Sequence, residues 1–458
     1  MNYELVVVGG GIGGLTTAAL MAARGVSVCV LERNSYVGGC AANVAHLGYE
    51  FEPTYALYQG FGPGEVFDQV FSELRITAPV VKQLSPAYVV RLPDGEEIAI
   101  TSEVDEFEQS LRQAFPECSD AAIGFYRSLT TSSEASAGSP VSTYLRNGST
   151  RFRDFVDAQL QTFLQRSSDT CSLEQAANIL NSRRGFWSID GGAQSLAETL
   201  AESISKSGGT IRLNAPVLRF AYGFDGQPAG VDLLTGQQVL ATKAIVSDLT
   251  VWDTYGKLIG LRRAPSGAVS VLRSLRSFGA YLLFLSMDAA AAARLPSRRI
   301  LALTKSQQTD RYDPFSDQLF FSCGSERDIA PPGKLPVTVT TFTHAEDWFS
   351  FHEDHGAHEE QDQRMLETVW SRLHSSMPEL GDAVEVIESA SPQTFYETTR
   401  RKFGMVGPAD YPSGEPEQIF TRPFPNVFIV SDTAQGRFGI ASVAAMAVNV
   451  SDLLTDWG

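Results

Sequence analysis

Apolar and polar residues follow one another in blocks at the start of the chain, and these blocks predict a strand, a helix and a second strand. Leu5–Val8 is an apolar run that stops at a cluster of glycines. Residues 15–25 are mostly small or apolar, and residues 26–31 form a second apolar run that stops at Glu32. Short apolar runs on either side of a glycine turn and a helix are typical of a unit with two parallel strands.

A matching block closes the chain. Residues 425–432 read as a short strand that ends on Asp432. A glycine-containing turn at 436–440 follows, and residues 441–454 are small and apolar on much of a helical surface. The two ends of the chain therefore predict parts of one α/β sheet.

The middle of the chain predicts a second sheet and several helices. A Pro93-Asp94-Gly95 turn separates two strands of a hairpin. Helices are expected over 103–130, broken at Pro116, and over 356–376. Strands are expected at 87–92, 98–100, 281–286, 318–322 and 337–341.

Residues 151–166 predict an amphipathic helix, because apolar residues such as Phe152 and Phe155 recur at helical spacing among arginines. Two interpretations stay open. The helix packs its apolar face on the protein's own core, or it lies at a membrane surface beside the mouth of a tunnel for a lipid-like substrate.

The glycines of the first turn give the clearest indication of a ligand. Gly9, Gly11 and Gly14 stand at the spacing G-x-G-x-x-G, and Glu32 lies at the distance expected of a ribose ligand. The helix N-terminus would offer N–H groups to a diphosphate. A glycine-rich turn of an unrelated α/β protein is the alternative. A membrane span or signal peptide is rejected, because five glycines within six positions and the lack of a basic leader fit neither.

Composition and charge bear on the protein's partners, its location and its capacity to bind metal. The chain has 458 residues and a net charge of −17, which disfavours nucleic acid as a partner. Five cysteines without metal or redox spacing indicate reduced thiols and a cytoplasmic protein. His352, His355 and His358 share a helical face, but their acidic neighbours favour a solvated helix, so no metal site is predicted.

Two segments of the chain resemble FAD-binding segments of flavoproteins. The segment from Glu32 and Arg33 to Gly38-Gly39 resembles the E-R-x-x-x-x-G-G stretch of glutathione-reductase-type FAD enzymes, which crosses the FAD pyrophosphate. The strand that ends on Asp432 resembles the segment that closes the FAD site in that superfamily. The resemblance implies FAD, with Asp432 on the ribityl chain and the last helix directed at the flavin.

Three further stretches narrow the resemblance to the phytoene desaturase, carotenoid isomerase and retinol saturase branch of the FAD-dependent amine-oxidase superfamily. They are 187–217, 391–407 and 155–160. Ser431-Asp432 departs from the family's Gly-Asp, and Glu52-Pro53-Thr54 departs from its Asp and nearby Gly. The resemblance and the glycine motif together imply a set of cofactor-binding residues. These are Gly9, Gly11, Ile12, Gly13, Gly14, Glu32, Arg33, Gly38, Gly39, Cys40, Val217, Asp432, Gly439, Ile440 and Val443.

The expected fold is α/β. A glutathione-reductase-type FAD-binding Rossmann domain is interleaved with an α+β substrate domain and a helical segment that the second interpretation places at a membrane. The FAD-binding domain is expected at 1–80, 184–260 and 391–458, and the substrate domain at 81–183 and 261–390.

The implied activity is oxidation or isomerisation of a long apolar polyene or isoprenoid, with hydride transfer to flavin N5. One alternative is a flavin oxidase or dehydrogenase of an amine or secondary metabolite, and another is a non-catalytic prenyl-binding escort of the same fold. Oxygen or a quinone is the expected electron acceptor, because the sequence shows no second dinucleotide motif. The expected location is the cytoplasm, with peripheral contact to the cytoplasmic face of a membrane. The sequence identifies no catalytic acid or base.

Overall fold

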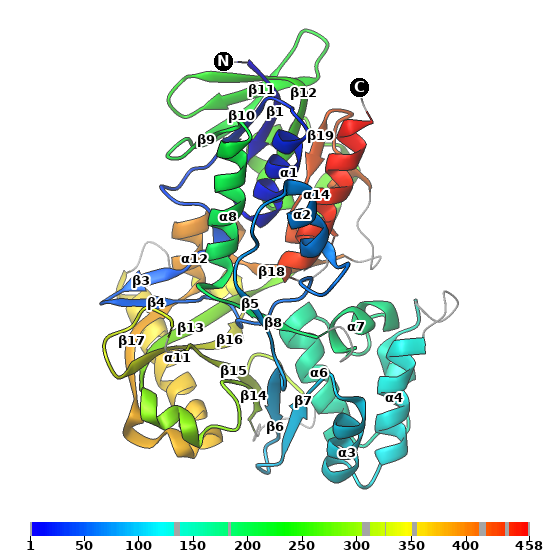
Figure 1. Cartoon of the computed structure of the whole chain (residues 1–458), viewed down its shortest axis with the longest axis vertical. Helices are drawn as coiled ribbons and strands as arrows, with labels where there is room; N and C mark the ends of the chain where they lie inside the picture. The colour runs from blue at the N-terminus through cyan, green and yellow to red at the C-terminus, as the bar shows by residue number, and fades with distance from the viewer. Residues whose placement is uncertain are drawn as a thin grey trace.

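The computed structural model describes residues 2–131, 138–181, 185–304, 312–325, 327–349, 355–411, 418–435 and 439–456. Two large sheets organise this part of the chain (Figure 1). A seven-stranded sheet lies at the end of the molecule that holds both termini, and an eight-stranded sheet lies at the other end.

The seven-stranded sheet confirms the predicted Rossmann-like unit. β1 (Asn2–Val8) runs parallel to both of its neighbours, and the last strand of the chain runs parallel to the end of β12. Val6 and Val7 are fully buried, as expected of a strand covered on both faces. In sheet order the strands are β10 (Val217–Tyr222), β11 (Pro228–Leu233), β12 (Gln238–Ser247), β1, β2 (Val28–Leu31) and β9 (Thr210–Arg212), with β19 (Val427–Ile429) beside β12.

Helices from distant parts of the chain pack on this sheet. α1 (Ile12–Ala23) lies against both α8 (Gly192–Lys206) and α14 (Gly439–Thr455), and α2 (Val66–Leu74) contacts α1 and α14. α1 begins at Ile12, three residues before the predicted start, so Gly13 and Gly14 belong to its first turn. Shorter helices occupy connections, namely α9 (Val251–Asp253), α10 (Ser266–Ser274), α12 (Pro392–Thr399) and α13 (Asp432–Gln435).

The eight-stranded sheet confirms the predicted hairpin and the three predicted central strands. Leu301 and Leu303 of β14 face a helical cluster, whereas Ile300 and Ala302 face the opposite cluster under α11 (His355–Ser376). In order the strands are β17 (Val384–Ala390), β13 (Arg276–Asp288), β16 (Lys334–Thr343), β15 (Gln318–Cys323), β14 (Arg299–Leu303), β6 (Tyr88–Arg91) and β7 (Glu97–Ile100), with β18 (Val406–Asp410) beside β13.

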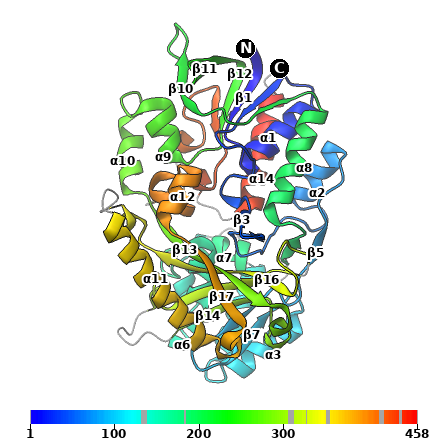
Figure 2. The same ribbon diagram turned by 90° about the vertical axis from the view of Figure 1, so that its left-hand side faces the viewer.

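The chain passes back and forth between the two sheets (Figure 2). Two small antiparallel pairs also form, β3 (Val44–His46) with β4 (Tyr49–Phe51) and β5 (Val81–Gln83) with β8 (Trp187–Ile189). The division of the chain into five domain segments, with their boundaries, stays a prediction.

The helical segment beside β14 corrects one hypothesis. α6 (Thr150–Leu164) packs with α3 (Val104–Ala114), α4 (Ser119–Thr131) and α7 (Leu173–Leu180). Phe152 and Phe155 are fully buried in this cluster, against Phe115 and Phe125. A membrane-facing surface formed by Phe152 and Phe155 is therefore wrong, because the protein's own core already covers both rings.

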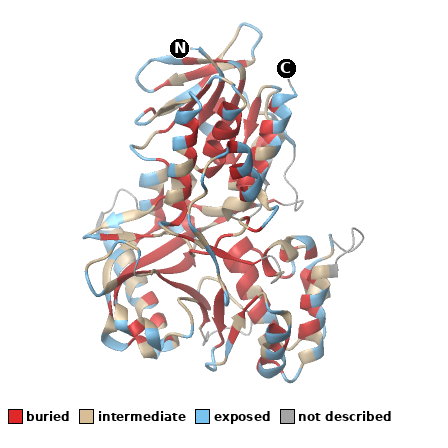
Figure 3. Cartoon of the chain, viewed as in Figure 1, coloured by how far each residue is buried: buried red, intermediate tan, exposed pale blue. Residues whose placement is uncertain are grey.

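Elsewhere in the molecule, the strands of the two large sheets are largely buried (Figure 3). All five cysteines are free thiols, and Cys29, Cys171 and Cys323 are buried. Across the described ranges, no helix has both the length and the apolar character needed to cross a membrane.

Candidate functional site

A cavity of about 1010 Å³ is lined by residues from both halves of the molecule. On one side it is bounded by the carboxyl ends of β1, β2, β12 and β19, which contribute Val8, Leu31, Asp248 and Ser431. On the other side it reaches residues of β13 and β16. Ligands of open parallel sheets bind beyond the carboxyl ends of the strands.

The first glycine turn leaves no room for side chains. Gly9 has a φ of +103°, and a Cβ on Gly14 would lie 2.6 Å from the Gly9 carbonyl oxygen. The second glycine pair crosses this turn, because the N–H of Gly38 donates to the Gly10 carbonyl oxygen at 2.8 Å. A Cβ on Gly39 would lie 3.3 Å from the Gly11 Cα. The two glycine segments therefore form a backbone cradle.

Glu32 holds this cradle in place. Its Oε2 accepts a hydrogen bond from the Gly10 N–H at 2.7 Å, and its Oε1 accepts one from the Asn34 N–H at 2.7 Å. A carboxylate offers about four acceptor positions, so acceptor capacity remains at this edge of the cavity. The neighbouring Arg33 also lines the cavity, and its Nη2 donates to the Thr398 carbonyl oxygen at the end of α12.

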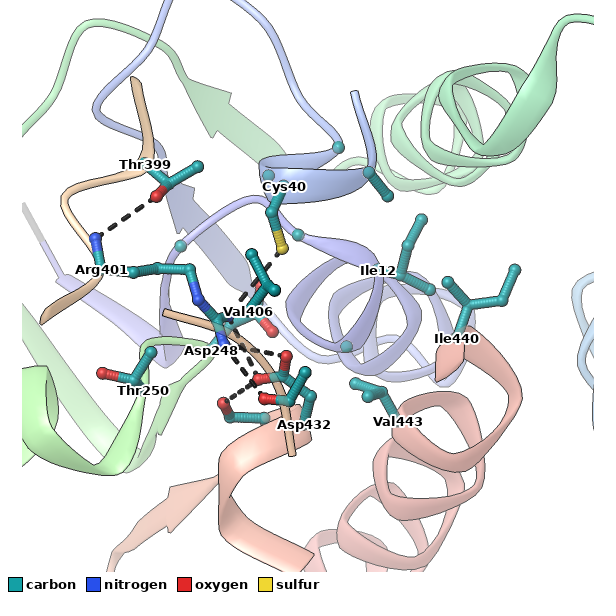
Figure 4. Close-up of a pocket in the computed structure, with 18 of the residues that line it drawn as sticks. Ile12, Cys40, Asp248, Thr250, Thr399, Arg401, Val406, Asp432, Ile440 and Val443 are labelled. Atoms are coloured by element: carbon teal, nitrogen blue, oxygen red, sulfur yellow. Dashed lines mark hydrogen bonds and ion pairs between the residues drawn. The ribbon is translucent and has the colours of Figure 1, made fainter. Parts of the chain in front are cut away.

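Asp432 is paired with a cation that the sequence analysis did not identify. The Arg401 guanidinium contacts both Asp432 carboxylate oxygens, at 3.0 and 3.2 Å, and lies 3.8 Å from the Cys40 Sγ (Figure 4). Burial lowers the pKa of Arg401, but Asp432, Cys40 and Asp253 together outweigh burial, so the pKa is raised. Burial raises the pKa of the Cys40 thiol. These three residues form one polar cluster on the cavity wall.

Asp248 is a second residue that was missed. It follows β12, and its Oδ2 would be 2.5 Å from a Cβ on Gly11. Burial raises the pKa of Asp248 well above its ordinary value, and the N–H groups of Gly11 and Gly14 offset only part of this effect. The position of Asp248 in the sequence could have indicated a site residue, because it follows a parallel strand as Glu32 and Asp432 do.

The start of α14 completes this half of the cavity. Gly439, Ile440 and Val443 line it, and Val443 Cγ1 would be 2.5 Å from a Cβ on Gly13. Val217, at the start of β10, lines it as well. Gly436, Arg437 and Phe438 of the preceding turn lie outside the described residues. The structure thus brings together every predicted cofactor-binding residue except Gly14, which packs beneath the turn.

The other half of the cavity has a different lining. The side chains that β13 and β16 present to it are uncharged. The apolar and aromatic residues on this side are Tyr55, Leu57, Tyr58, Ile179, Phe186, Ala280, Leu282, Phe342 and Phe395. An apolar lining with few polar groups is typical of small-molecule sites.

Among the residues whose placement is described, no group of three or more His, Cys, Asp or Glu side chains could hold a metal ion. His352 lies outside the described residues.

Comparisons with known proteins find a Rossmann-like family model at the start of the chain and relatives over most of its length. Residues 7–74 match the family model of the NAD(P)-binding Rossmann-like domain. Prolycopene isomerase 2 of an Oncidium hybrid cultivar, a chloroplastic protein, is 24% identical over 98% of this chain and 83% of its own length. All-trans-retinol 13,14-reductase of Danio rerio is 21% identical over 90% of this chain and 78% of its own length.

The fold is found in solved structures as well. An oxidoreductase from Methanosarcina mazei superposes with a TM-score of 0.74 at 18% identity, covering 99% of this chain and 100% of the other. That likeness shows the fold, while the sequence relatives confirm the resemblance inferred from the motifs. The chain is similar to prolycopene isomerase and all-trans-retinol 13,14-reductase over nearly its whole length, and to a carotenoid 3,4-desaturase and a phytoene desaturase over 35% and 22% of it. These relatives support the carotenoid desaturase and isomerase branch of the FAD-dependent amine-oxidase superfamily.

Proposed function

We propose that this protein is an FAD-dependent oxidoreductase that acts on a long apolar polyene or isoprenoid, by desaturation, saturation or isomerisation. The observation that supports this most is the single cavity with two linings. One side is a backbone cradle with acidic residues, and the other carries uncharged and aromatic side chains. At about 1010 Å³, the cavity is at the upper end of the roughly 300–1,000 Å³ range of ligand sites.

The residues present fit a flavin dinucleotide. The cradle of Gly11 and Gly39 would be filled by any Cβ, so only backbone N–H groups meet a diphosphate there. Glu32 would accept hydrogen bonds from the adenosine ribose, and Val217 would lie against the adenine. When bound, FAD would supply the hydride acceptor or donor of the reaction.

The flavin end would lie between Asp432 and the start of α14. The Asp432 carboxylate, held by Arg401, would accept hydrogen bonds from the ribityl chain. The helix N-terminus at Gly439 and Ile440 would favour negative charge on a reduced flavin. The chain's own role here is to bind, to orient and to exclude water.

The uncharged half of the cavity favours an apolar substrate. Each CH₂ group taken out of water contributes about 0.8 kcal/mol, so a long polyene needs no charged anchor. Oxygen or a quinone remains the proposed electron acceptor, and the cytoplasm the proposed location. An amine or secondary metabolite as substrate, and an escort role without flavin, are the competing outcomes of the test.

The test begins with the purified protein loaded with FAD. We expect a yellow protein that releases FAD, rather than FMN, on acid denaturation. A poly-cis C40 polyene in detergent micelles should then bleach the flavin without oxygen, or isomerise when the flavin is reduced beforehand. A colourless protein after loading would favour the escort, and flavin bleaching by putrescine but by no polyene would favour the amine alternative.

A further inference from the structure

A chain of hydrogen-bonded side chains leads from an acid beside the cavity to the cavity wall. Thr54 Oγ1 lies 3.0 Å from Glu52 Oε1 and 3.0 Å from the Tyr58 hydroxyl oxygen. Thr54 and Tyr58 line the cavity. These three residues, which we call the Glu52 relay, are not among the residues that would hold the dinucleotide.

The hydrogen bonds around Thr54 fix the direction of the relay. Its hydroxyl has one proton and two lone pairs, and it accepts from the Ala56 N–H at 3.2 Å. When Glu52 is ionised, Thr54 must donate to it, so Tyr58 donates to Thr54 and presents a lone pair to its other side. When Glu52 carries a proton on Oε1, the two relay bonds reverse, so Glu52 donates to Thr54, Thr54 donates to Tyr58, and Tyr58 has a free O–H, while the Ala56 N–H still donates to Thr54.

The surroundings of Glu52 allow both the ionised and the protonated form of its carboxyl group near neutral pH. Burial raises the pKa of Glu52 to about 7, although the Thr54 hydroxyl, the Arg299 cation and the Ala193 N–H all lower it. Asp328 acts in the same direction as burial. Arg299 is fixed in turn, because its Nε donates to the Ala56 carbonyl oxygen at 2.8 Å. A general base works best when its pKa is close to the working pH.

The position of the relay suits proton transfer at the flavin end of the cavity. Two residues after Tyr58, a Cβ on Gly60 would lie 2.8 Å from the Cβ of Ala441 in the first turn of α14. The backbone of Tyr58 is held by two hydrogen bonds with Trp187, of 2.7 and 2.9 Å. The backbone of Tyr58 is therefore fixed two residues before the contact with the helix start that would face the flavin, in the segment that carries the departure Glu52-Pro53-Thr54.

We propose that the Glu52 relay is the acid–base group of the proposed reaction, with Tyr58 as its contact to the substrate. In desaturation, bound FAD would supply the acceptor for the hydride that one substrate carbon gives up. The proton of the neighbouring carbon passes to the Tyr58 oxygen, while the Tyr58 proton moves to Thr54 and the Thr54 proton to the Glu52 carboxylate. The electron pair of the second C–H bond forms the new C=C bond. Saturation runs the same relay in reverse.

This inference rests on the proposed function, so its experiment has one arm that needs no substrate. Infrared difference spectra of the FAD-loaded protein, with ring-labelled tyrosine, are recorded across pH 5–9. A carboxyl group should titrate with a pKa of about 7, and a tyrosine band should change with it. Glu52→Gln should remove both signals and Tyr58→Phe the tyrosine signal. Thr54→Val should keep the carboxyl titration but uncouple the tyrosine.

Tyr49→Phe is the matched control for the tyrosine band. Its hydroxyl donates to Ser286 Oγ in the core and lies outside the cavity lining, so the coupled signal should persist. Because burial also raises the pKa of Asp154, to about 6, the carboxyl band is assigned by its loss in Glu52→Gln. A tyrosine band that ignores the carboxyl titration in the wild type would overturn the relay.

The second arm follows anaerobic flavin bleaching by the poly-cis C40 polyene. The wild-type rate should rise with pH around 7, because the carboxylate is the acceptor. Glu52→Gln and Tyr58→Phe should lower the rate by about 10²–10⁴-fold and flatten its pH profile, with FAD content unchanged. Wild-type-like rates and profiles in both variants would reject the catalytic role. If no polyene reacts with the wild type, the proposed function fails, while the infrared arm still decides whether the relay exists.

Discussion

In the dinucleotide half of the cavity the walls are mainly backbone, whereas in the substrate half they are side chains from distant strands. A Cβ on any of Gly9, Gly11, Gly38 and Gly39 would lie between 2.5 and 3.3 Å from a neighbouring atom, so none fits without a shift. The opposite wall is formed by residues such as Leu282 and Phe342, on β13 and β16. The first half would recognise a ligand common to many enzymes, and the proposed substrate of the second half could change through side chains alone.

The largest effect is expected in the helical cluster behind the substrate half. Phe155 is fully buried, with its ring centroid 5.2 Å from that of Phe115. Phe155→Ala should lower the free energy of unfolding by about 3–5 kcal/mol, measured by urea denaturation. Arg153→Ala, at an exposed position of the same helix, should cost about 1 kcal/mol or less. A stable Phe155→Ala protein that no longer binds liposomes would restore the membrane interpretation.

A pH-dependent effect of similar size is expected at Glu52, beside the substrate half. Its pKa is raised from 4.5 to about 7 in the folded protein. The contribution of Glu52 to the free energy of unfolding is complete below pH 4.5 and is lost as the pH rises through about 7. At about 1.4 kcal/mol per pKa unit, the wild type should lose on the order of 2–3 kcal/mol more than Glu52→Gln between pH 5 and 8. Parallel pH profiles of urea denaturation in the two proteins would contradict this.

In the dinucleotide half, Glu32→Ala should weaken FAD binding by roughly 1.5–3 kcal/mol, which is roughly ten- to a hundredfold in affinity. The loss includes the two N–H groups of Gly10 and Asn34 that Glu32 now satisfies. Titration of the apo-protein with FAD measures it. Glu32→Gln keeps one acceptor oxygen and should lose less of the affinity for FAD. An unchanged FAD affinity in Glu32→Ala would rule out the role of Glu32 as a ribose ligand.

Gly14→Ala tests whether backbone packing builds this half. The added Cβ would meet the Gly9 carbonyl oxygen at 2.6 Å and Asp248 Cβ at 3.0 Å, so α1 must move away from the turn. We expect a loss of about 1–3 kcal/mol in stability together with weaker FAD binding. Gly124→Ala is the control, because a Cβ at this exposed position of α4 meets nothing within 4 Å, and the variant should gain up to about 1 kcal/mol in stability.

The two halves also differ in what the sequence could predict. Gly9, Gly11, Gly14 and Glu32 lie within one strand-helix-strand unit, so their spacing along the chain is enough to predict where they meet. Arg401 and Asp432 meet only through the packing of β18 and α13, and no local spacing marks that pair.

Burial explains the error at α6. A helix that packs in a core and a helix that binds a membrane have the same amphipathic pattern. Only the position of α3 and α4 over Phe152 and Phe155 distinguishes the two, and that depends on tertiary contacts.

The smallest effect is expected where an acid lies inside the backbone cradle. Asp248 faces Gly11 and Gly13 at the N-terminus of α1, where a diphosphate would bind. Burial raises its pKa, so the neutral carboxyl is favoured, and a nearby diphosphate would raise the pKa further. FAD affinity of the wild type should therefore fall as the pH rises through the pKa of Asp248.

Asp248→Asn keeps the size of the side chain and removes the charge. It should bind FAD about as well as the wild type at low pH and up to roughly tenfold better, or about 1.4 kcal/mol, at high pH. Asp225→Asn is the control, because it removes one charge at the exposed β10–β11 turn and keeps the oxygen that accepts from the Gln227 N–H. It should leave the pH dependence of FAD binding unchanged. If Asp248→Asn binds FAD more weakly than the wild type at every pH, the carboxyl is a ligand of the dinucleotide rather than a charge beside it.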